Sequence, residues 1–258
     1  MTAGPGRDRD WMGEIFACLG FFTRLPMPAY RLAPDGFSRA LWAAPLAGLV
    51  PAVAATVALS FGHAVDLPPL ASAGLALVVL LLITGALHED GLSDVADGFG
   101  GGSTRARKLE IMKDSRIGTY GVAALVLSLL LRAALLAALV PYGFGITLAT
   151  LIAAHCASRG LLPYTMHTLP NAREGGVSAG VGQVPKNSAM LALLLGFFAL
   201  LPLGFGHAIL AAILLGLIVV SLHRLALRQI GGQTGDVLGM VQQVAEVGVL
   251  IVAVAALR

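Results

Sequence analysis

A short run of acidic residues lies directly after a long apolar stretch of the chain. The apolar stretch ends at Leu87, and four carboxylates follow within nine residues: Glu89, Asp90, Asp94 and Asp97. Carboxylates at or near bilayer depth are costly and usually remain there for a function. In a helix, Asp90, Asp94 and Asp97 stand at positions i, i+4 and i+7, on one face. We therefore expect a hard cation such as Mg²⁺ between these mutually repelling oxygen ligands.

A second polar segment, residues 105–118, follows the acidic run and carries groups that suit phosphate. Lys113, Asp114 and Arg116 gather just before Gly118. Asp114 is expected to complete the metal site. Lys113 and Arg116 are expected to hold phosphate oxygens, and the guanidinium of Arg116 can do so with two parallel hydrogen bonds. The alternative is a solvated helix with ordinary pairs at helical spacing.

The third polar segment precedes the last apolar stretch and reads Gly-Gly-Gln-Thr-Gly-Asp over residues 231–236. Its glycines allow a ligand to approach the backbone closely, while Thr234 offers a hydroxyl and Asp236 a carboxylate. A substrate-binding turn and a plain loop at the membrane surface explain this composition equally well.

Three charged residues fall inside apolar stretches. Glu246 stands in the last stretch, where an unpaired charge would cost several kcal/mol. Arg132 and Arg159 are its candidate partners, and the sequence leaves open which pair forms. Arg132 suits a structural role, whereas Arg159 suits either a structural or a substrate-binding role.

The composition is that of a membrane protein. Hydrophobic residues make up 57% of the 258-residue chain and charged residues 12%, with a mean hydropathy of +0.84; a soluble domain carries roughly 25% charged residues. We expect an all-α, polytopic integral membrane helix bundle, a single domain over residues 1–258, with about seven transmembrane helices in a range of about six to eight.

The expected spans are 41–61, 70–87, 121–140, 146–169, 188–205, 207–222 and 237–256. The 188–222 region also fits one long broken element, and Met12–Leu25 fits a helix at the membrane surface.

Lys and Arg are distributed asymmetrically among the connecting segments. They occur in the segments 1–40, 88–120, 170–187 and 223–236, whereas the segments 62–69, 141–145 and 204–207 contain none. Cytoplasmic loops are enriched in Lys and Arg. We therefore expect a cytoplasmic or interfacial N-terminal segment at 1–40, a cytoplasmic carboxylate-rich segment at 88–120 and a cytoplasmic Gly-rich loop at 223–236. Nucleic-acid binding is not expected, because the basic residues follow the topology and aromatic residues are only 6% of the chain.

Several motifs resemble those of the cobalamin synthase family, also named adenosylcobinamide-GDP ribazoletransferases. The most specific are Thr84–Gly98 (TGALHEDGLSDVADG) and Leu109–Gly121 (LEIMKDSRIGTYG), and Gly231–Gly239 (GGQTGDVLG) follows later. The short stretches Phe22–Pro26 (FTRLP), Ala157–Gly160 (ASRG) and Ala172–Gly175 (AREG) are also similar. The resemblance covers nearly the whole chain. One position departs from it, because Glu89 stands where the family pattern has an apolar residue.

The resemblance implies a reaction in late vitamin B12 biosynthesis. A family member joins adenosylcobinamide-GDP to α-ribazole or its 5′-phosphate, GMP leaves, and adenosylcobalamin or its 5′-phosphate forms. Mg²⁺ is the implied cofactor and the bacterial inner membrane the implied location. The residues suit this chemistry, since such transfer depends on positioning and charge neutralisation and metal-bound carboxylates stabilise attacking and leaving oxygens. Further expected partners are the lipid bilayer and either a second copy of the chain or a complex of pathway enzymes.

The reaction assigns expected roles to the polar residues. Asp90 is expected to be the catalytic base that accepts the hydroxyl proton, and Lys113 and Arg116 are expected to neutralise phosphate charge. The expected metal ligands are Asp90, Asp94, Asp97, Asp114 and Glu89. The expected substrate-binding residues are His88, Ser115, Gly118, Arg24, Arg159, Arg173, Thr234 and Asp236.

Two other functions share some of these features. The fragment Asp94-Val-Ala-Asp97-Gly98 resembles part of the CDP-alcohol phosphotransferase motif, and those enzymes displace a nucleoside monophosphate in an analogous way. A cation- or proton-coupled transporter would also use intramembrane acids, on broken helices and often in paired halves. Here the acids lie beside basic segments and no internal repeat is evident, so the sequence favours the enzyme.

Overall fold

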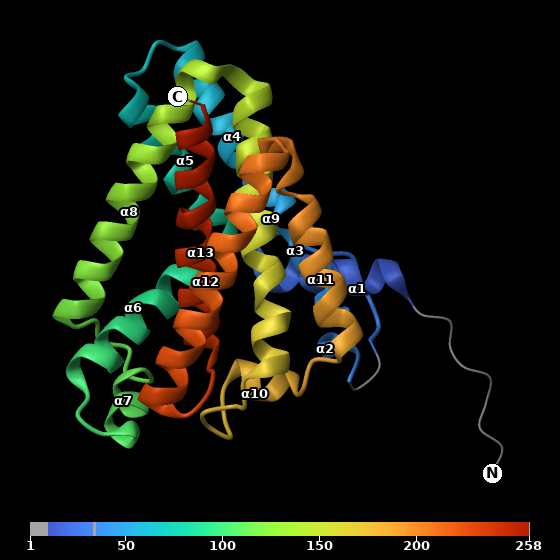
Figure 1. Cartoon of the computed structure of the whole chain (residues 1–258), viewed down its shortest axis with the longest axis vertical. Coiled ribbons are helices and arrows are strands. Elements are labelled where there is room, and N and C mark those ends of the chain that lie inside the picture. The colour runs from blue at the N-terminus through green and yellow to red at the C-terminus, as the bar shows by residue number, and fades with distance from the viewer. Residues whose placement is uncertain (1–9, 33–34, 258) are drawn as a thin grey trace.

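The computed structural model describes residues 10–32 and 35–257, and the first nine residues of the expected N-terminal segment lie outside this range. The described residues form a bundle of helices, in which the β-type pairing is limited to an isolated bridge between Asn171 and Gln233. Figure 1 shows long helices running side by side, with shorter helices at the lower end of the bundle. The prediction of an all-α bundle is confirmed.

The helices follow one another with short connections. In chain order they are α1 (Trp11–Phe22), α2 (Gly36–Ala40), η1 (Leu41–Ala43), α3 (Ala44–Ala47), α4 (Leu49–Ala64), α5 (Pro69–Thr84), α6 (Leu87–Gly101), α7 (Arg105–Ile111), α8 (Thr119–Leu139), η2 (Val140–Tyr142), α9 (Gly143–Thr168), α10 (Val177–Val181), α11 (Lys186–Phe198), η3 (Leu201–Leu203), α12 (Phe205–Ile230) and α13 (Gly235–Ala256).

Five described segments are long and apolar enough to cross a membrane, and the bent pair α5 and α6 raises this number to six. The five are Gly36–Ala64, Thr119–Thr168, Lys186–Leu203, Phe205–Ile230 and Gly235–Ala256. The second of them contains two helices, α8 with 21 residues and α9 with 26, which run in opposite directions in Figure 1. Counting α8 and α9 separately gives the predicted number of about seven spans, and each of the two is long enough for one.

Two predicted spans differ from the observed helices. The span expected at 41–61 follows α2 and begins as the short pieces η1 and α3 before α4 continues, because Pro45 and Pro51 each lack the N–H of a regular helical turn. The span expected at 70–87 ends at Thr84. Gly85 and Ala86 follow with φ angles of 64° and 54°, and the chain turns by 91° into α6. The bend therefore takes α6, which carries the acidic run, out of the direction in which α5 crosses the membrane.

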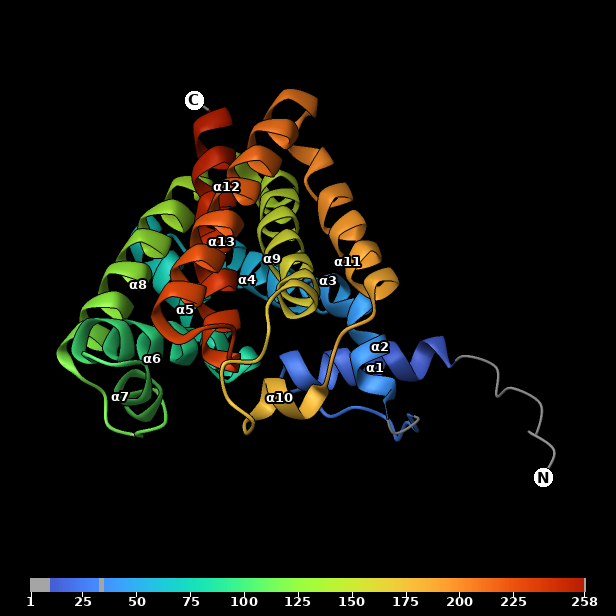
Figure 2. The same cartoon turned by 60° about the horizontal axis from the view of Figure 1, so that its bottom comes forward.

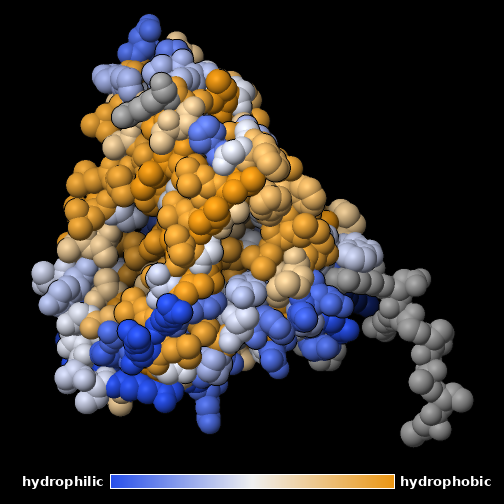
Figure 3. Space-filling model, in the orientation of Figure 1, coloured by the Kyte–Doolittle hydropathy of each residue, from blue (hydrophilic) through white to orange (hydrophobic). Residues whose placement is uncertain are grey.

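The surface of the bundle is apolar along the long helices and hydrophilic at the ends. Figure 3 shows a broad band of hydrophobic residues, with hydrophilic residues concentrated at the lower end. Leu82 on α5 and Phe205 on α12 expose 70% and 75% of their surface, which suits contact with lipid. In Figure 2, α1 and α10 lie across the lower ends of the long helices. The short helices thus cover the end of the bundle at which α6 and α7 also lie.

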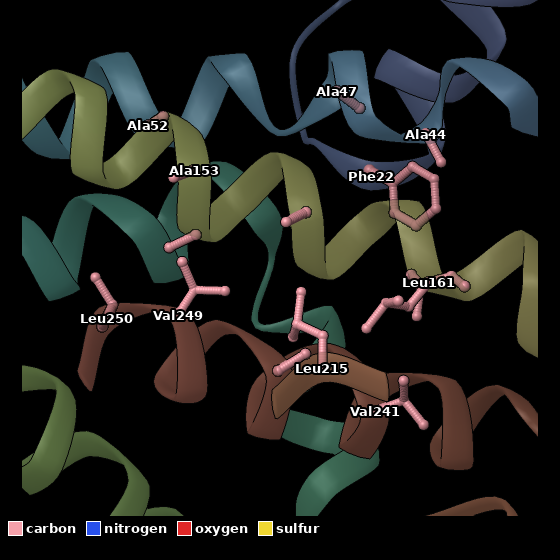
Figure 4. Packing of buried hydrophobic residues seen from close by; sticks show 14 of the residues in the cluster. Phe22, Ala44, Ala47, Ala52, Ala153, Leu161, Leu215, Val241, Val249 and Leu250 are labelled. Atoms are coloured by element: carbon pink, nitrogen blue, oxygen red, sulfur yellow. The ribbon is translucent and has the colours of Figure 1, made fainter. Parts of the chain in front are cut away.

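The interior is packed largely by small residues. Figure 4 shows Ala44, Ala47 and Ala52 facing α9, and each of the three is completely buried. The helices also approach closely at Gly160 of α9, where a Cβ would lie 2.8 Å from the carbonyl oxygen of Ala192 on α11. Such contacts are typical of membrane bundles, in which close approach of backbones replaces the hydrophobic driving force.

Candidate active site

Helix α6 crosses α13 at a pair of glycines. A Cβ on Gly91 would lie 3.2 Å from Cα of Gly239 and 2.8 Å from the carbonyl oxygen of Asp236, and a Cβ on Gly239 would lie 2.9 Å from the carbonyl oxygen of His88. No larger residue permits this approach. The crossing brings the acidic run of α6 beside the Gly-rich turn that precedes α13, so two motifs separated by more than a hundred residues form one site.

Three carboxylates share this site, two from α6 and one from the start of α13. Burial and then the charges of Asp90, Asp236 and Asp97, in that order, together raise the pKa of Asp94 to about 7. The charge of Arg173 opposes them. The sequence therefore predicted correctly that the carboxylates of Asp90 and Asp94 repel, and the structure adds the carboxylate of Asp236 to this pair.

Asp97 is engaged with the start of α8. Its Oδ2 accepts a hydrogen bond from the backbone N–H of Gly118 at 2.7 Å, and its Oδ1 accepts one from Gly121 at 2.8 Å. A Cβ at either glycine would lie within 2.5 Å of this carboxylate. Asp97 thus satisfies backbone donors that a helix start leaves without intrahelical partners, and a negative charge is favourable there. This is a different environment from that of the other two α6 aspartates.

The loop between α7 and α8 borders a polar cavity of about 420 Å³. Asp90, Asp94, Lys113, Ser115 and Arg116 are among its lining residues, so the cavity unites the acidic run with the expected phosphate-binding segment. Positive side chains and carboxylates that line one cavity can hold a phosphate group and a cation together.

Within this loop, Asp114 and Arg116 form an ion pair. The Arg116 Nη2 and Asp114 Oδ2 atoms are 2.6 Å apart, and Nε also donates to Asp114. These hydrogen bonds lower the pKa of Asp114 to about 2. The Arg116 side chain is 86% exposed. Lys113 makes no ion pair with any described residue, so its ammonium group remains available at the cavity wall.

The AREG motif and the Gly-rich turn are hydrogen-bonded to one another. The backbone N–H of Gln233 donates to the carbonyl of Pro170, and that of Ala172 donates to the carbonyl of Gln233, each at 2.8 Å. Arg173 Nη2 lies 3.4 Å from Asp236 Oδ2, which also accepts from the Thr234 hydroxyl at 3.1 Å. The structure thus brings together three of the expected substrate-binding residues: Arg173, Thr234 and Asp236.

A buried ionic network lies beneath the site. Arg132 of α8 donates to Glu89 of α6 at 2.7 Å and lies 3.0 Å from Glu246 of α13. Glu246 also lies 3.0 Å from Nδ1 of His155 on α9. Gln243 donates a further hydrogen bond to Glu89 Oε1 at 3.2 Å. Arg132 is therefore the partner that the sequence left open for Glu246. Glu89, expected as a metal ligand, is instead committed to Arg132 in the interior, so we leave it out of the proposed ligand set.

Three other expected substrate-binding residues lie in different surroundings. Arg159 is 1% exposed and donates to the carbonyl of His155 at 3.1 Å, which places it in the interior of the bundle beside the ionic network. Arg24 packs against the bend, since a Cβ on Gly85 would lie 2.2 Å from its Nε. His88 is buried and stacks on Phe22, with ring centroids 5.9 Å apart. Arg24 thus contacts the turn that precedes α6, whereas the hydrogen bonds of Arg159 stay within α9.

The described residues contain no group of three or more His, Cys, Asp or Glu side chains arranged to hold a metal ion. Their chemistry nevertheless fits Mg²⁺, because Asp90, Asp94 and Asp236 offer only oxygen ligands and their like charges oppose one another. Asp114 and Asp97 are engaged with Arg116 and with backbone N–H groups, respectively. The Mg²⁺ expectation therefore stays a prediction, centred on the first three carboxylates.

A second, apolar cavity adjoins the carboxylates and was not expected from the sequence. It measures about 240 Å³, and Asp90 lines it as well as the polar cavity. Phe21, Phe22 and Phe37 contribute aromatic rings to its wall. The pair Phe21-Phe22, whose second residue begins the FTRLP motif, was the available signal, but an aromatic pair on a short apolar helix is more often a membrane or core contact.

These features define a class of protein: a polytopic helical membrane protein with a cluster of carboxylates, a loop that carries Lys113 and Arg116, and an apolar cavity at one end. The chain belongs to the cobalamin-5-phosphate synthase family, whose sequence profile matches residues 14–254. A protein of Mesorhizobium japonicum is 51% identical over 257 residues, covering 100% of this chain and 97% of that protein. Proteins of Bradyrhizobium diazoefficiens and Azorhizobium caulinodans are 48% and 45% identical, covering 99% and 93% of this chain and 98% and 94% of those proteins.

All three relatives are named adenosylcobinamide-GDP ribazoletransferase. No solved structure matches the chain. The family resemblance expected from the motifs is confirmed.

The buried ionic network predicts a large difference between two arginines. Replacing Arg132 by Met leaves Glu89 and Glu246 without their cation, which we expect to cost about 3–5 kcal/mol of stability. Arg107→Met is the matched control, because Arg107 is 56% exposed and pairs only with Glu110; exposed pairs contribute about 0–1 kcal/mol. Unfolding of the two purified variants in detergent measures the difference. Equal stability of both would show that the network does not hold the bundle together.

Proposed function

We propose that this chain joins adenosylcobinamide-GDP to α-ribazole, or to its 5′-phosphate, with release of GMP. The observation that carries the proposal is its membership of the family along nearly its whole length, with relatives that are 42–51% identical and bear the transferase name. The residues that suit this chemistry gather at one end of the bundle, around Asp90.

The proposed reaction is a displacement at phosphorus. The ribose hydroxyl oxygen forms a bond to the phosphorus that carries the cobinamide, and the bond from this phosphorus to the bridging oxygen breaks. GMP leaves with that oxygen. The hydroxyl proton passes to a carboxylate, for which Asp90 is the best placed because it lines both cavities. The transfer therefore needs positioning and charge neutralisation rather than a strong nucleophile.

We assign the pyrophosphate to the polar cavity. Lys113 and Arg116 would neutralise its charge, and Ser115 lies between them on the same loop. Asp90, Asp94 and Asp236 are the residues that would hold Mg²⁺. A bound Mg²⁺ supplies positive charge next to the attacking and leaving oxygens. The raised pKa of Asp94 supports this assignment, because burial and the neighbouring carboxylates both raise it and a bound cation would oppose both effects.

We propose that the site faces the cytoplasm and that the protein resides in the bacterial inner membrane. Support comes from α7, with Arg105, Arg107 and Lys108, which lies at the same end of the bundle as α6 and α10. Cytoplasmic segments are enriched in such residues.

Cysteine labelling tests this orientation. Ser103 and Asp66 are both exposed, and the native Cys18 and Cys156 are buried. In intact cells, a membrane-impermeant maleimide is expected to label Asp66→Cys and to spare Ser103→Cys, and lysis should make Ser103→Cys reactive. The reverse pattern would place the site on the opposite side.

The carboxylates should be essential for turnover. We expect Asp90→Asn and Asp94→Asn to reduce the rate of GMP release at least about a hundredfold, as removal of one charge-stabilising contact commonly does. Removal of Mg²⁺ with a chelator should have the same effect on the unmodified protein. Glu110→Gln is the control, because Glu110 is exposed on the neighbouring α7. Near-normal GMP release by both aspartate variants would remove this cluster from the active site.

The geometry of the guanidinium should matter at Arg116. Arg116→Lys keeps the charge but loses the planar pair of donors. We expect a higher KM for adenosylcobinamide-GDP together with a lower kcat, and a much smaller change in the KM for α-ribazole. Arg107→Lys, in the exposed part of α7, serves as the control. If Arg116→Lys retains full activity, the residue contributes charge alone.

A further inference from the structure

The apolar cavity is enclosed by elements that are distant in the sequence. Its lining comes from α1, α2, η1, α6, α9, α10 and α13 and from the loop that carries Arg173, and Figure 2 shows α1 and α10 beside the lower ends of the long helices. The walls include Phe21, Phe22, Phe37, Met166 and Val181. Aromatic rings gathered around a small space favour a flat, aromatic ligand.

The cavity also has a polar side. His88, Asp90, Arg173, Ser178 and Asp236 line it. His88 is 3% exposed, and its buried Nε2 atom has no hydrogen-bond partner among the described residues. The same is true of Nη1 of Arg173. Buried polar atoms are nearly always hydrogen-bonded, so two unpartnered nitrogens in residues that line one cavity indicate a ligand with polar atoms of its own.

The size of the cavity decides which part of the proposed substrates could bind in it. Its volume is about 240 Å³, below the range of roughly 300–1,000 Å³ for pockets that hold drug-sized ligands. A corrin macrocycle does not fit. Guanine would fit, but its edge carries several donors and acceptors that the apolar walls would leave unpaired, at a cost. A benzimidazole, the base of a ribazole, has two fused aromatic rings and a single free ring nitrogen.

Asp90 connects this cavity to the reacting atoms. It lines both the apolar cavity and the polar cavity that holds Lys113 and Arg116. A riboside with its base in the apolar cavity would therefore present its ribose at Asp90, and the pyrophosphate would lie on the other side. This is the arrangement that an attack by a ribose hydroxyl on phosphorus needs.

We propose that the apolar cavity is the binding site for the aromatic base of the ribazole acceptor, with the free ring nitrogen hydrogen-bonded to His88. The inference rests on the proposed function, which supplies the acceptor. The inference adds the residues that determine specificity. Phe22, Phe37 and Val181 define the space for the rings, and His88 forms the hydrogen bond to the free ring nitrogen.

Filling the cavity tests the proposal directly. Val181→Phe places a ring in the space assigned to the base. We expect the Kd of free α-ribazole, measured by equilibrium dialysis with purified protein, to rise at least about tenfold, and the KM for α-ribazole to rise in parallel. The KM for adenosylcobinamide-GDP should stay within about twofold. Phe205→Ala is the control, since Phe205 is 75% exposed on the outside of the bundle.

Enlarging the cavity provides a second measurement that does not depend on how Val181→Phe folds. Phe37→Ala is expected to accept an acceptor with a three-ring base, such as a naphthimidazole riboside, several-fold better relative to α-ribazole than the unmodified protein does. An unchanged preference between the two bases, together with an unchanged Kd in Val181→Phe, would overturn the proposal. A rise in the KM for adenosylcobinamide-GDP alone would also overturn it, because guanine would then be the occupant.

These outcomes are distinct from failure of the proposed function. If the unmodified protein releases no GMP but binds α-ribazole in a way that Val181→Phe abolishes, the reaction is wrong and the binding site stands. If it releases GMP and both cavity variants behave as the unmodified protein does, the reaction stands and the base binds elsewhere.

Discussion

The ion pairs of Arg132 are the interaction on which the arrangement of the site depends. A guanidinium in the interior of a membrane bundle is costly unless polar or anionic partners compensate it, and Arg132 has two carboxylates, Glu89 and Glu246. These three residues belong to α8, α6 and α13, so the requirement for compensation ties together three helices. Glu89 directly precedes Asp90. The same contact that neutralises Arg132 therefore fixes the first turn of α6, from which Asp90 faces the two cavities.

Close backbone contacts then determine how near the Gly-rich turn before α13 lies to the acidic run of α6. The turn at Gly85 and Ala86 directs α6 across the bundle, and the contact between Gly91 and Gly239 lets it touch α13. Each contact is local, but together they place Asp236 beside Asp94. Asp97 completes the arrangement, because its two hydrogen bonds hold the start of α8 against the far end of α6. The charged network and the glycine contacts thus both join α6 to α13.

Much of this was predictable from the sequence, and what was missed has a physical reason. Apolar length indicated the number of spans, and helical spacing correctly placed Asp90 and Asp94 where they act on each other. Helical spacing shows which residues share a helix face, but not which other element that face contacts. The spacing therefore predicted the same metal-binding role for Asp97 as for Asp90 and Asp94, although the Asp97 carboxylate accepts hydrogen bonds from backbone N–H groups at the start of α8. For the same reason Glu89 was expected at the metal and is found at Arg132. The apolar cavity was missed because its lining residues come from elements far apart in the sequence, from α1 to α13.

The position of the cavities offers an account of why a reaction between water-soluble molecules would take place in a membrane protein. An aromatic base is held best by rings in a dry, rigid environment, and such an environment is readily built from helices that are already buried. The phosphates need the opposite, an exposed and charged surface, which the loop after α7 provides at the end of the bundle. Asp90 stands where the two environments meet. A helix turned by 91° at the edge of the membrane reaches both, whereas a straight span would expose its acids either to lipid or to water alone.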